Sequence, residues 1–197
     1  MTTIAVTGGI ACGKTTLGRC LSGEGVSVCD ADDLAHDAMA PGSDLLGKIV
    51  SVFGRDVVGE DGGLDRVVLG RRVFADERER EALNRLVHPE VRRRCREWVA
   101  RQDRAQRVAA VIVPLLYEAG FDDEPWQAVV CVTASHEIQC ARLAQRGLGM
   151  RDAEMRIASQ MPVREKEKLA DFVVVNNASL EILRRQVTKV LQRILEA

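Results

Sequence analysis

The chain has 197 residues, of which 46% are hydrophobic and 29% charged, and its formal net charge is -1. This composition is typical of a folded globular protein and excludes a disordered chain. A net charge this close to zero provides no general attraction for nucleic acid, so we expect no nucleic-acid partner. No apolar run approaches the ~18 residues that span a bilayer, so we expect no membrane segment.

The cysteines indicate the compartment. The chain has six of them, and no two have the Cys-x-x-Cys spacing. The three histidines are not placed along the sequence to complete a zinc site. The N-terminus leads straight into an apolar strand rather than into a basic-then-apolar leader. We therefore expect reduced thiols in a cytoplasmic protein.

Short apolar runs alternate with helical segments along the chain. Strands are predicted, in order, at residues 3–7, 26–29, 109–113, 128–132 and 172–175. Helices are predicted at residues 14–22 and from residue 180 onward, where apolar residues recur at helical spacing. This alternation predicts an α/β fold with a five-stranded parallel sheet flanked by helices. Residues 33–105 are mostly helical and too long for a simple crossover, so we expect an inserted lobe.

Residues 8–15, GGIACGKT, match the phosphate-loop pattern GxxxxGK[ST] at every position. The motif lies between a predicted strand and a predicted helix, which is the context that the pattern requires. The backbone N–H groups of such a loop, with the helix N-terminus that follows, bind phosphate oxygens. We expect Lys14 to bridge the β- and γ-phosphates of a nucleoside triphosphate, and Thr15 to offer its hydroxyl to Mg²⁺.

Cys12 is an unusual residue for a phosphate loop. A thiol at a helix N-terminus tends toward a lowered pKa and raised reactivity. One hypothesis is therefore that alkylation of Cys12 inactivates the protein and that bound nucleotide protects it. The alternative is that Cys12 is a small filler whose side chain points away from the phosphates.

Further motifs follow in order along the chain. They are TGGI at residues 7–10, DAD at 30–32, APGS at 40–43, LDR at 64–66, LVHP at 86–89, VPLLYE at 113–118, RIASQMP at 156–162, ADF at 170–172 and NN at 176–177. Together they resemble the dephospho-CoA kinase family over essentially the whole chain. That family usually has Gly-Ser where this chain has Ala11-Cys12, and often Gly at the position of Ala178. The backbone N–H groups survive the first change, so we expect phosphate binding to persist.

The resemblance implies a P-loop kinase fold like that of nucleoside monophosphate kinases. It implies ATP-dependent phosphorylation of the ribose 3′-hydroxyl of dephospho-CoA, the last step of coenzyme A synthesis, with Mg²⁺. We expect one domain over residues 1–197, acting as a monomer, with a core at 1–32, 106–134 and 169–197, a helical substrate lobe at 33–105 and a lid at 135–168. The implied ATP contacts in the loop are Gly9, Ile10, Ala11, Cys12, Gly13, Lys14, Thr15 and Thr16.

Two carboxylates follow the second predicted strand. In an extended segment residues two apart face the same way, so we expect Asp30 and Asp32 to point together toward a site beyond the strand ends. A hydroxyl that attacks a γ-phosphate needs a proton acceptor, for which a carboxylate is suitable. Asp32 matches the family's motif aspartate and is the first candidate for this catalytic role, and Asp30 is the second. One of them could instead hold water around Mg²⁺, and N-capping of a helix that begins near Leu34 is the structural alternative.

His88 precedes Pro89, and a proline suits the first turn of a helix, so we expect His88 at a helix start. Arg92 lies four residues further on, close to the same face. The resemblance implies that His88 and Arg92 contact the substrate, and that Leu115 of the Pro-Leu-Leu motif also does. The alternative for the histidine and the arginine is a helix cap beside a solvated basic face.

Arg142 and Arg146 lie four residues apart on a predicted helix that ends at Gly147. A guanidinium that closes over the transferring phosphoryl group stabilises its negative charge. We therefore expect Arg142 to be catalytic and both arginines to bind ATP. Ion pairs with Glu137 or Glu154 are the alternative for arginines of this region.

Asn176 and Asn177 follow the last predicted strand, where they are expected either to hydrogen-bond adenine or to form a plain turn. Glu118 follows the third strand, near where P-loop enzymes place an acid close to Mg²⁺. That strand has no terminal aspartate, so we expect Mg²⁺ to have only Thr15, phosphates and water as ligands.

Two rival functions share the phosphate loop. A different kinase of the same fold would act on a nucleotide or a small metabolite, and would need lobe motifs other than LVHP and VPLL. A nucleotide switch such as a GTPase would require an Asn-Lys-x-Asp guanine motif, and NNAS at residues 176–179 is not one. The motifs beyond the loop therefore favour the resemblance described above.

Overall fold

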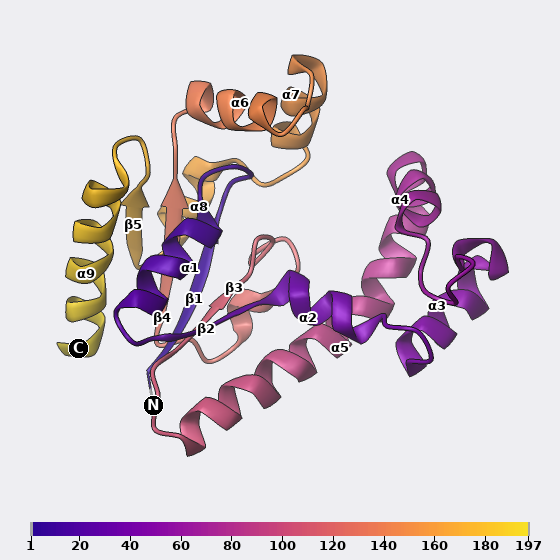
Figure 1. Ribbon diagram of the computed structural model, residues 1–197, viewed down its shortest axis with the longest axis horizontal. Helices are drawn as coiled ribbons and strands as arrows, with labels where there is room; N and C mark the ends of the chain where they lie inside the picture. Colours follow the sequence, from indigo (N-terminus) through magenta and orange to yellow (C-terminus); the bar gives the residue numbers. More distant parts are fainter. Residues whose placement is uncertain (1, 197) are drawn as a thin grey trace. The chain divides into compact units, whose positions relative to one another are not determined.

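The computed structural model describes residues 2–196. The chain divides into two compact units. The first comprises the residues up to Asp30 and those from Val99 onward, and the second comprises Ala31–Trp98. Figure 1 traces the chain through both. No helix of the described part is long and apolar enough to cross a membrane.

The first unit is built on a five-stranded sheet with the strand order β2-β3-β1-β4-β5. All of its pairings are parallel. The five-stranded parallel sheet predicted from the apolar runs is confirmed, because each observed strand begins and ends within one residue of its predicted bounds. The strands are β1 (Thr3–Gly8), β2 (Ser27–Asp30), β3 (Ala109–Ile112), β4 (Ala128–Thr133) and β5 (Phe172–Val175).

Helices flank this sheet. They are α1 (Lys14–Gly23), α6 (His136–Gln145), α7 (Met150–Ala158), α8 (Val163–Leu169) and α9 (Leu180–Glu196), with a short 3-10 turn η2 (Phe121–Asp123). The helices α1 and α9 pack on each other and on the sheet, and α8 packs on β1 and β4. Apolar residues every three or four positions, such as Leu183 and Val187 on α9, bury one stripe against strand residues such as Val174. Each such side chain stabilises the unit by roughly 2 kcal/mol when fully buried.

The parallel arrangement places the carboxyl ends of all five strands at one edge of the sheet. The phosphate loop follows β1 at this edge, Asp30 ends β2, and Asn176 follows β5 directly. The loop, α6 and α7 lie at the same end of the sheet in Figure 1. Polar residues far apart in sequence therefore gather there.

The second unit is mainly helical. Its elements are α2 (Ala31–Ala38), α3 (Asp44–Phe53), the 3-10 turn η1 (Arg55–Val57), α4 (Arg66–Ala75) and most of α5 (Glu77–Arg104), whose residues from Val99 onward belong to the first unit. Side chains cap two of the helix starts: Ser43 accepts from the Leu46 N–H at 3.2 Å, and Asp65 caps α4. The unit has its own core, which includes Ala38, Leu45, Ile49, Phe53, Val57 and Leu69.

Candidate active site

The phosphate loop depends on two glycines. Gly8 has a φ of 144° and Gly13 a φ of 102°, both in a region that L side chains rarely adopt. A Cβ atom on Gly13 would lie 2.1 Å from Nδ2 of Asn176, and one on Gly8 would lie 2.1 Å from the carbonyl oxygen of Val132. Ala11, between them, also has a positive φ of 58°. The loop is thus wound tightly against β4 and the segment after β5.

The start of α1 is open to an anion. Gly13 is its N-cap and makes no side-chain cap, so the first N–H groups of the helix are available to a bound anion. Lys14 reaches back over the loop and donates from Nζ to the carbonyl oxygens of Gly8 and Gly9, at 3.0 Å each. Thr15 is exposed in the first turn. A cation, a hydroxyl and a row of N–H groups therefore share one small region.

Two side chains brace the loop from behind. Nη1 of Arg142 donates to the carbonyl oxygens of Ala11 at 3.0 Å and Cys12 at 3.3 Å. Nδ2 of Asn176 donates to the same Cys12 oxygen at 2.8 Å, and Nη2 of Arg142 donates to the Asn176 carbonyl at 3.0 Å. Because these donors fix the loop carbonyls, they also fix the direction of the neighbouring N–H groups. The loop is held in shape before any ligand arrives.

Gln160 holds the loop at its other side. Its Oε1 atom accepts from the N–H of Ile10 at 2.9 Å. A cavity of about 630 Å³ lies beside this contact, with Gly9, Ile10, His136, Gln160 and Asn177 among its lining residues. The volume is within the usual range of small-molecule sites.

Cys12 lies before a helix N-terminus, yet its thiol does not have the lowered pKa that is typical of such a position. The residue is fully buried, and burial raises the pKa of its thiol, against the opposing effects of the Ala134 backbone and the Lys14 charge. The lowered pKa of the reactive-thiol hypothesis is not found, because desolvation outweighs the favourable charges. Cys12 packs in the core beneath the loop, as the filler alternative describes.

The remaining residues predicted to bind ATP lie around α6. Arg146 caps the C-terminus of α6 and is exposed. Asn177 is exposed and accepts the Ser135 N–H at 2.8 Å through Oδ1. Glu154, one alternative partner of the arginines, instead bonds His136. Asn176 is buried, and its amide nitrogen donates to the Cys12 carbonyl of the loop rather than facing the cavity.

The two candidate carboxylates have different local structures. Asp30 is the last residue of β2 and is half-buried, whereas Asp32 is exposed in the first turn of α2. The expectation that both lie in one extended segment is wrong, because the helix begins at Ala31 and not near Leu34. Residues two apart point to different sides of a helix, so a shared direction does not follow from the spacing.

His88 lies inside a helix rather than at its start. The helix α5 runs without interruption through Pro89, so the predicted helix start there is wrong. The proline removes a single backbone hydrogen bond from a helix of 28 residues, and the rest of the helix persists around it. Burial, and then the charge of Arg92, lower the pKa of the half-buried His88. The two side chains are therefore near one another, as their spacing predicted.

A second cavity, of about 650 Å³, lies within the second unit. Lys48, Glu90, Arg93 and Arg94 are among its lining residues, whereas His88 and Arg92 are not. Glu90 accepts from Arg93 at 2.7 Å and from Arg94 at 2.8 Å, and these bonds lower its pKa to about 2. The carboxylate thus offsets part of the positive charge of this cavity.

Behind β3, Glu118 is held by a buried lysine. Nζ of Lys166 is 2.8 Å from Oε1 of Glu118 and donates to the Pro114 carbonyl, also at 2.8 Å. Glu118 also accepts from the Met161 N–H at 3.0 Å. A carboxylate with these partners anchors the segment before α8. Leu115, which lies between Pro114 and Glu118 in the sequence, is 40% exposed.

The sequence did not single out Gln160 and Lys166 as structural contacts. Gln160 bonds a residue 150 positions away, and Lys166 bonds one 48 positions away. The one available signal for Gln160 was its place in the RIASQMP motif, since residue spacing gives no hint of either partner.

Comparison with known proteins shows the family to which the chain belongs. The family model described as dephospho-CoA kinase matches residues 2–181. The chain is 44% identical to the dephospho-CoA kinase of Anaeromyxobacter dehalogenans, over 97% of this chain and 91% of that one. It is 46% identical to that of Symbiobacterium thermophilum, over 95% and 79%. A solved dephospho-CoA kinase from Campylobacter jejuni superimposes with a TM-score of 0.73 at 30% identity, covering 98% and 96%.

A braced phosphate loop at the edge of a parallel sheet is the site of a P-loop kinase, and the family match identifies which kind. With a match that spans residues 2–181 and relatives that align over nearly all of it, this chain belongs to the dephospho-CoA kinase family, ATP-dependent enzymes that phosphorylate dephospho-CoA to coenzyme A in the last step of its synthesis.

Proposed function

We propose that the loop between β1 and α1 presents the γ-phosphoryl group of ATP to the ribose 3′-hydroxyl of dephospho-CoA. The observation that carries this proposal is the bracing of the loop by Arg142 and Asn176. With the carbonyls of Ala11 and Cys12 held on one side, the N–H groups at the uncapped start of α1 are left for phosphate oxygens. Phosphoryl transfer depends mainly on position and charge, which a rigid loop and Lys14 supply.

The ATP contacts are assigned to the loop and its surroundings. Arg146 is exposed near the end of α6 and is free to approach the triphosphate side of ATP. Asn177 lines the cavity beside the loop, where an adenine could be held. Arg142 acts by positioning the loop, since its terminal nitrogens already bind backbone carbonyls. The loop residues that contact ATP are Gly9, Ile10, Ala11, Cys12, Gly13, Lys14, Thr15 and Thr16.

Mg²⁺ fits the donors that the chain offers. Thr15 presents an exposed hydroxyl in the first turn of α1, and β3 ends in apolar residues. Glu118 is already bound by Lys166. Thr15 would therefore hold the ion together with phosphates and water, which suits a cation that sheds water reluctantly. When bound, Mg²⁺ neutralises charge that develops between the β- and γ-phosphates.

Asp32 is our candidate for the group that accepts the proton of the 3′-hydroxyl, and Asp30 is the second. Asp32 is exposed, so its carboxylate is accessible to a substrate hydroxyl. His88, Arg92 and Leu115 are assigned to substrate binding. His88 and Arg92 lie on one face of α5, and Leu115 is exposed after β3.

We further propose that the enzyme is a cytoplasmic monomer that binds no nucleic acid. ATP is an intracellular donor, and the net charge of -1 provides no general attraction for a polyanion. Light scattering after size-exclusion chromatography tests the oligomeric state, and a mass twice that of the 21.7 kDa chain would contradict it.

The substitution Asp32→Asn tests the proposed base. We expect kcat to fall by about 10²–10⁴-fold, the usual contribution of a general base, with ATP affinity nearly unchanged. Asp33→Asn is a matched control, because Asp33 is exposed in the same first turn of α2. A kcat near that of the unmodified enzyme in Asp32→Asn would exclude this role for Asp32.

A further inference from the structure

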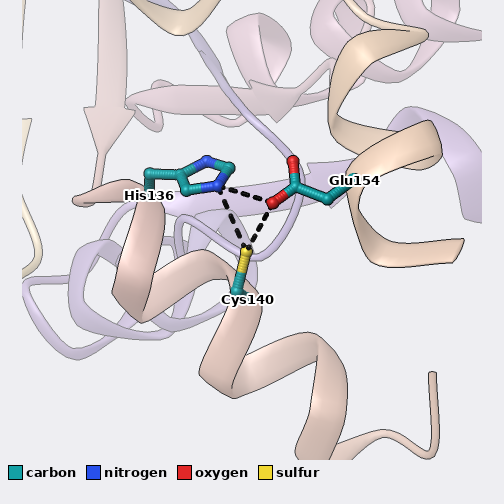
Figure 2. A group of neighbouring side chains, drawn as sticks. All are labelled: His136, Cys140 and Glu154. Atoms are coloured by element: carbon teal, nitrogen blue, oxygen red, sulfur yellow. Dashed lines mark hydrogen bonds and ion pairs between the residues drawn. The ribbon is translucent and has the colours of Figure 1, made fainter. Parts of the chain in front are cut away.

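Three side chains of metal-binding type meet between α6 and α7. His136 is the first residue of α6, Cys140 lies one turn further along the same helix, and Glu154 comes from α7. Figure 2 shows the imidazole, the thiol and the carboxylate turned toward a common point. Within residues 2–196, this is the one group of three or more such side chains whose donor atoms lie close enough to share an ion.

The distances between the donor atoms are within about half an ångström of those in a tetrahedral zinc site. Usual Zn–N, Zn–S and Zn–O bond lengths at tetrahedral angles place two ligand atoms about 3.4–3.6 Å apart. Here Nε2 of His136 lies 3.5 Å from Sγ of Cys140 and 2.9 Å from Oε1 of Glu154, and Sγ lies 3.8 Å from the same Oε1. Shifts of about half an ångström in exposed side chains are enough to bring all three onto one ion.

The donor set selects a particular class of metal. A thiolate and an imidazole favour Zn²⁺ and similar transition metals over Mg²⁺, which requires oxygen ligands. The His136–Glu154 ion pair does not by itself explain why the three side chains lie together. Both of its side chains are about half exposed, and such pairs contribute at most about 1 kcal/mol. A metal uses all three side chains, and the exposed side of the group leaves a fourth position for water.

We propose that His136, Cys140 and Glu154 form a Zn²⁺ site that joins α6 to α7. None of its three ligands belongs to the phosphate loop, although His136 also lines the cavity beside that loop. The site nevertheless links the two segments that hold this loop, since α6 carries Arg142 and α7 leads into Gln160. A bound ion would thus fix the loop's two braces to one another.

Cobalt titration tests the site directly. Chelator-treated protein, free of ATP and Mg²⁺, is titrated with Co²⁺ and then with Zn²⁺. We expect about one Co²⁺ per chain, with the thiolate-to-cobalt charge-transfer band and the intense visible bands of tetrahedral Co²⁺, and displacement by Zn²⁺. The thermal midpoint should rise with added Zn²⁺, because the ion binds the folded chain.

Matched variants separate this site from other thiols. Cys140→Ser should abolish the charge-transfer band and weaken Zn²⁺ binding by more than about tenfold, since loss of even an outer-shell partner costs 10–100-fold. Cys29→Ser, at another half-buried cysteine, should leave both unchanged. Glu154→Gln should weaken Zn²⁺ binding but keep the charge-transfer band. Asp152→Asn, on the same helix, should change neither the affinity nor the band. No band in the unmodified protein, or an equal band in Cys140→Ser, would overturn the proposal.

Discussion

Gly13 is one of the two glycines on which the shape of the phosphate loop depends. Its φ is 102°, and an added Cβ would lie 2.1 Å from the amide nitrogen of Asn176. We predict that Gly13→Ala lowers the free energy of unfolding by about 1–3 kcal/mol and weakens ATP binding, because both backbone strain and a clash result. Urea denaturation and equilibrium binding of ATP measure the two effects.

Gly42→Ala is the control for that substitution. Gly42 has a φ of 77°, but no atom lies within 4 Å of the added Cβ. The Gly42→Ala variant should therefore lose only the ~1 kcal/mol of stability that left-handed backbone strain costs, and its ATP affinity should be unchanged. Equal effects of the two substitutions on ATP binding would show that the contact with Asn176 is unimportant.

The reactivity of each cysteine depends on its own burial. Of the six free cysteines, Cys29 and Cys140 are half-buried and the others, including Cys12, are buried. We predict that iodoacetamide modifies Cys29 and Cys140 first in the native protein and Cys12 only slowly, because burial raises its pKa. Peptide mass mapping over time checks the order. Rapid labelling of Cys12, with protection by ATP, would restore the reactive-thiol hypothesis.

At the scale of elements, the turn between β5 and α9 supports the loop after β1. Nδ2 of the buried Asn176 donates to the Cys12 carbonyl. We predict that Asn176→Ala lowers the free energy of unfolding by about 1–3 kcal/mol, because a buried acceptor loses a partner, and that it weakens ATP binding. The neighbouring Asn177→Ala, at an exposed side chain, should leave stability nearly unchanged. Similar unfolding curves for the two variants would contradict the bracing role of Asn176.

Sequence patterns located the elements well but not their long-range contacts. The strands and α1 follow from apolar runs and from the loop motif, which are local signals. Pro89 misled the prediction, because a proline also fits within a long helix whose other hydrogen bonds remain. The contacts of Asn176 with Cys12 and of Gln160 with Ile10 join residues 164 and 150 positions apart, and only the folded chain brings them together.

The site proposed between α6 and α7 shows the same limit. His136 and Cys140 are four residues apart, but their third partner is fourteen positions beyond Cys140, on another helix. The spacing of histidines and cysteines along the chain indicates no zinc site, because the third ligand of the proposed site is a carboxylate. A carboxylate from a neighbouring helix becomes visible only once the two helices are placed side by side.

For the molecule as a whole, His88 links stability to pH. Its pKa in the folded protein is lowered from the ordinary 6.5 by burial and by Arg92, so the unfolded chain binds more protons just below that pH. The contribution of the neutral His88 to the free energy of unfolding is complete above pH 6.5. It is lost as the pH falls through the lowered pKa of His88 in the folded protein. We predict that the free energy of unfolding falls from pH 7.5 to pH 5.5, and that His88→Gln reduces this fall. Urea denaturation at several pH values measures it, and an unchanged pH dependence in His88→Gln, equal to that of the exposed-site control His36→Gln, would contradict it.

The central claim about the whole enzyme is that dephospho-CoA is the phosphoryl acceptor. Measurement of ADP release with different acceptors tests this claim most directly. With ATP and Mg²⁺, dephospho-CoA should give ADP and coenzyme A in equal amounts, while AMP, shikimate or water should give almost none. ADP release that is as fast without dephospho-CoA, or as fast with AMP or shikimate, would contradict the account.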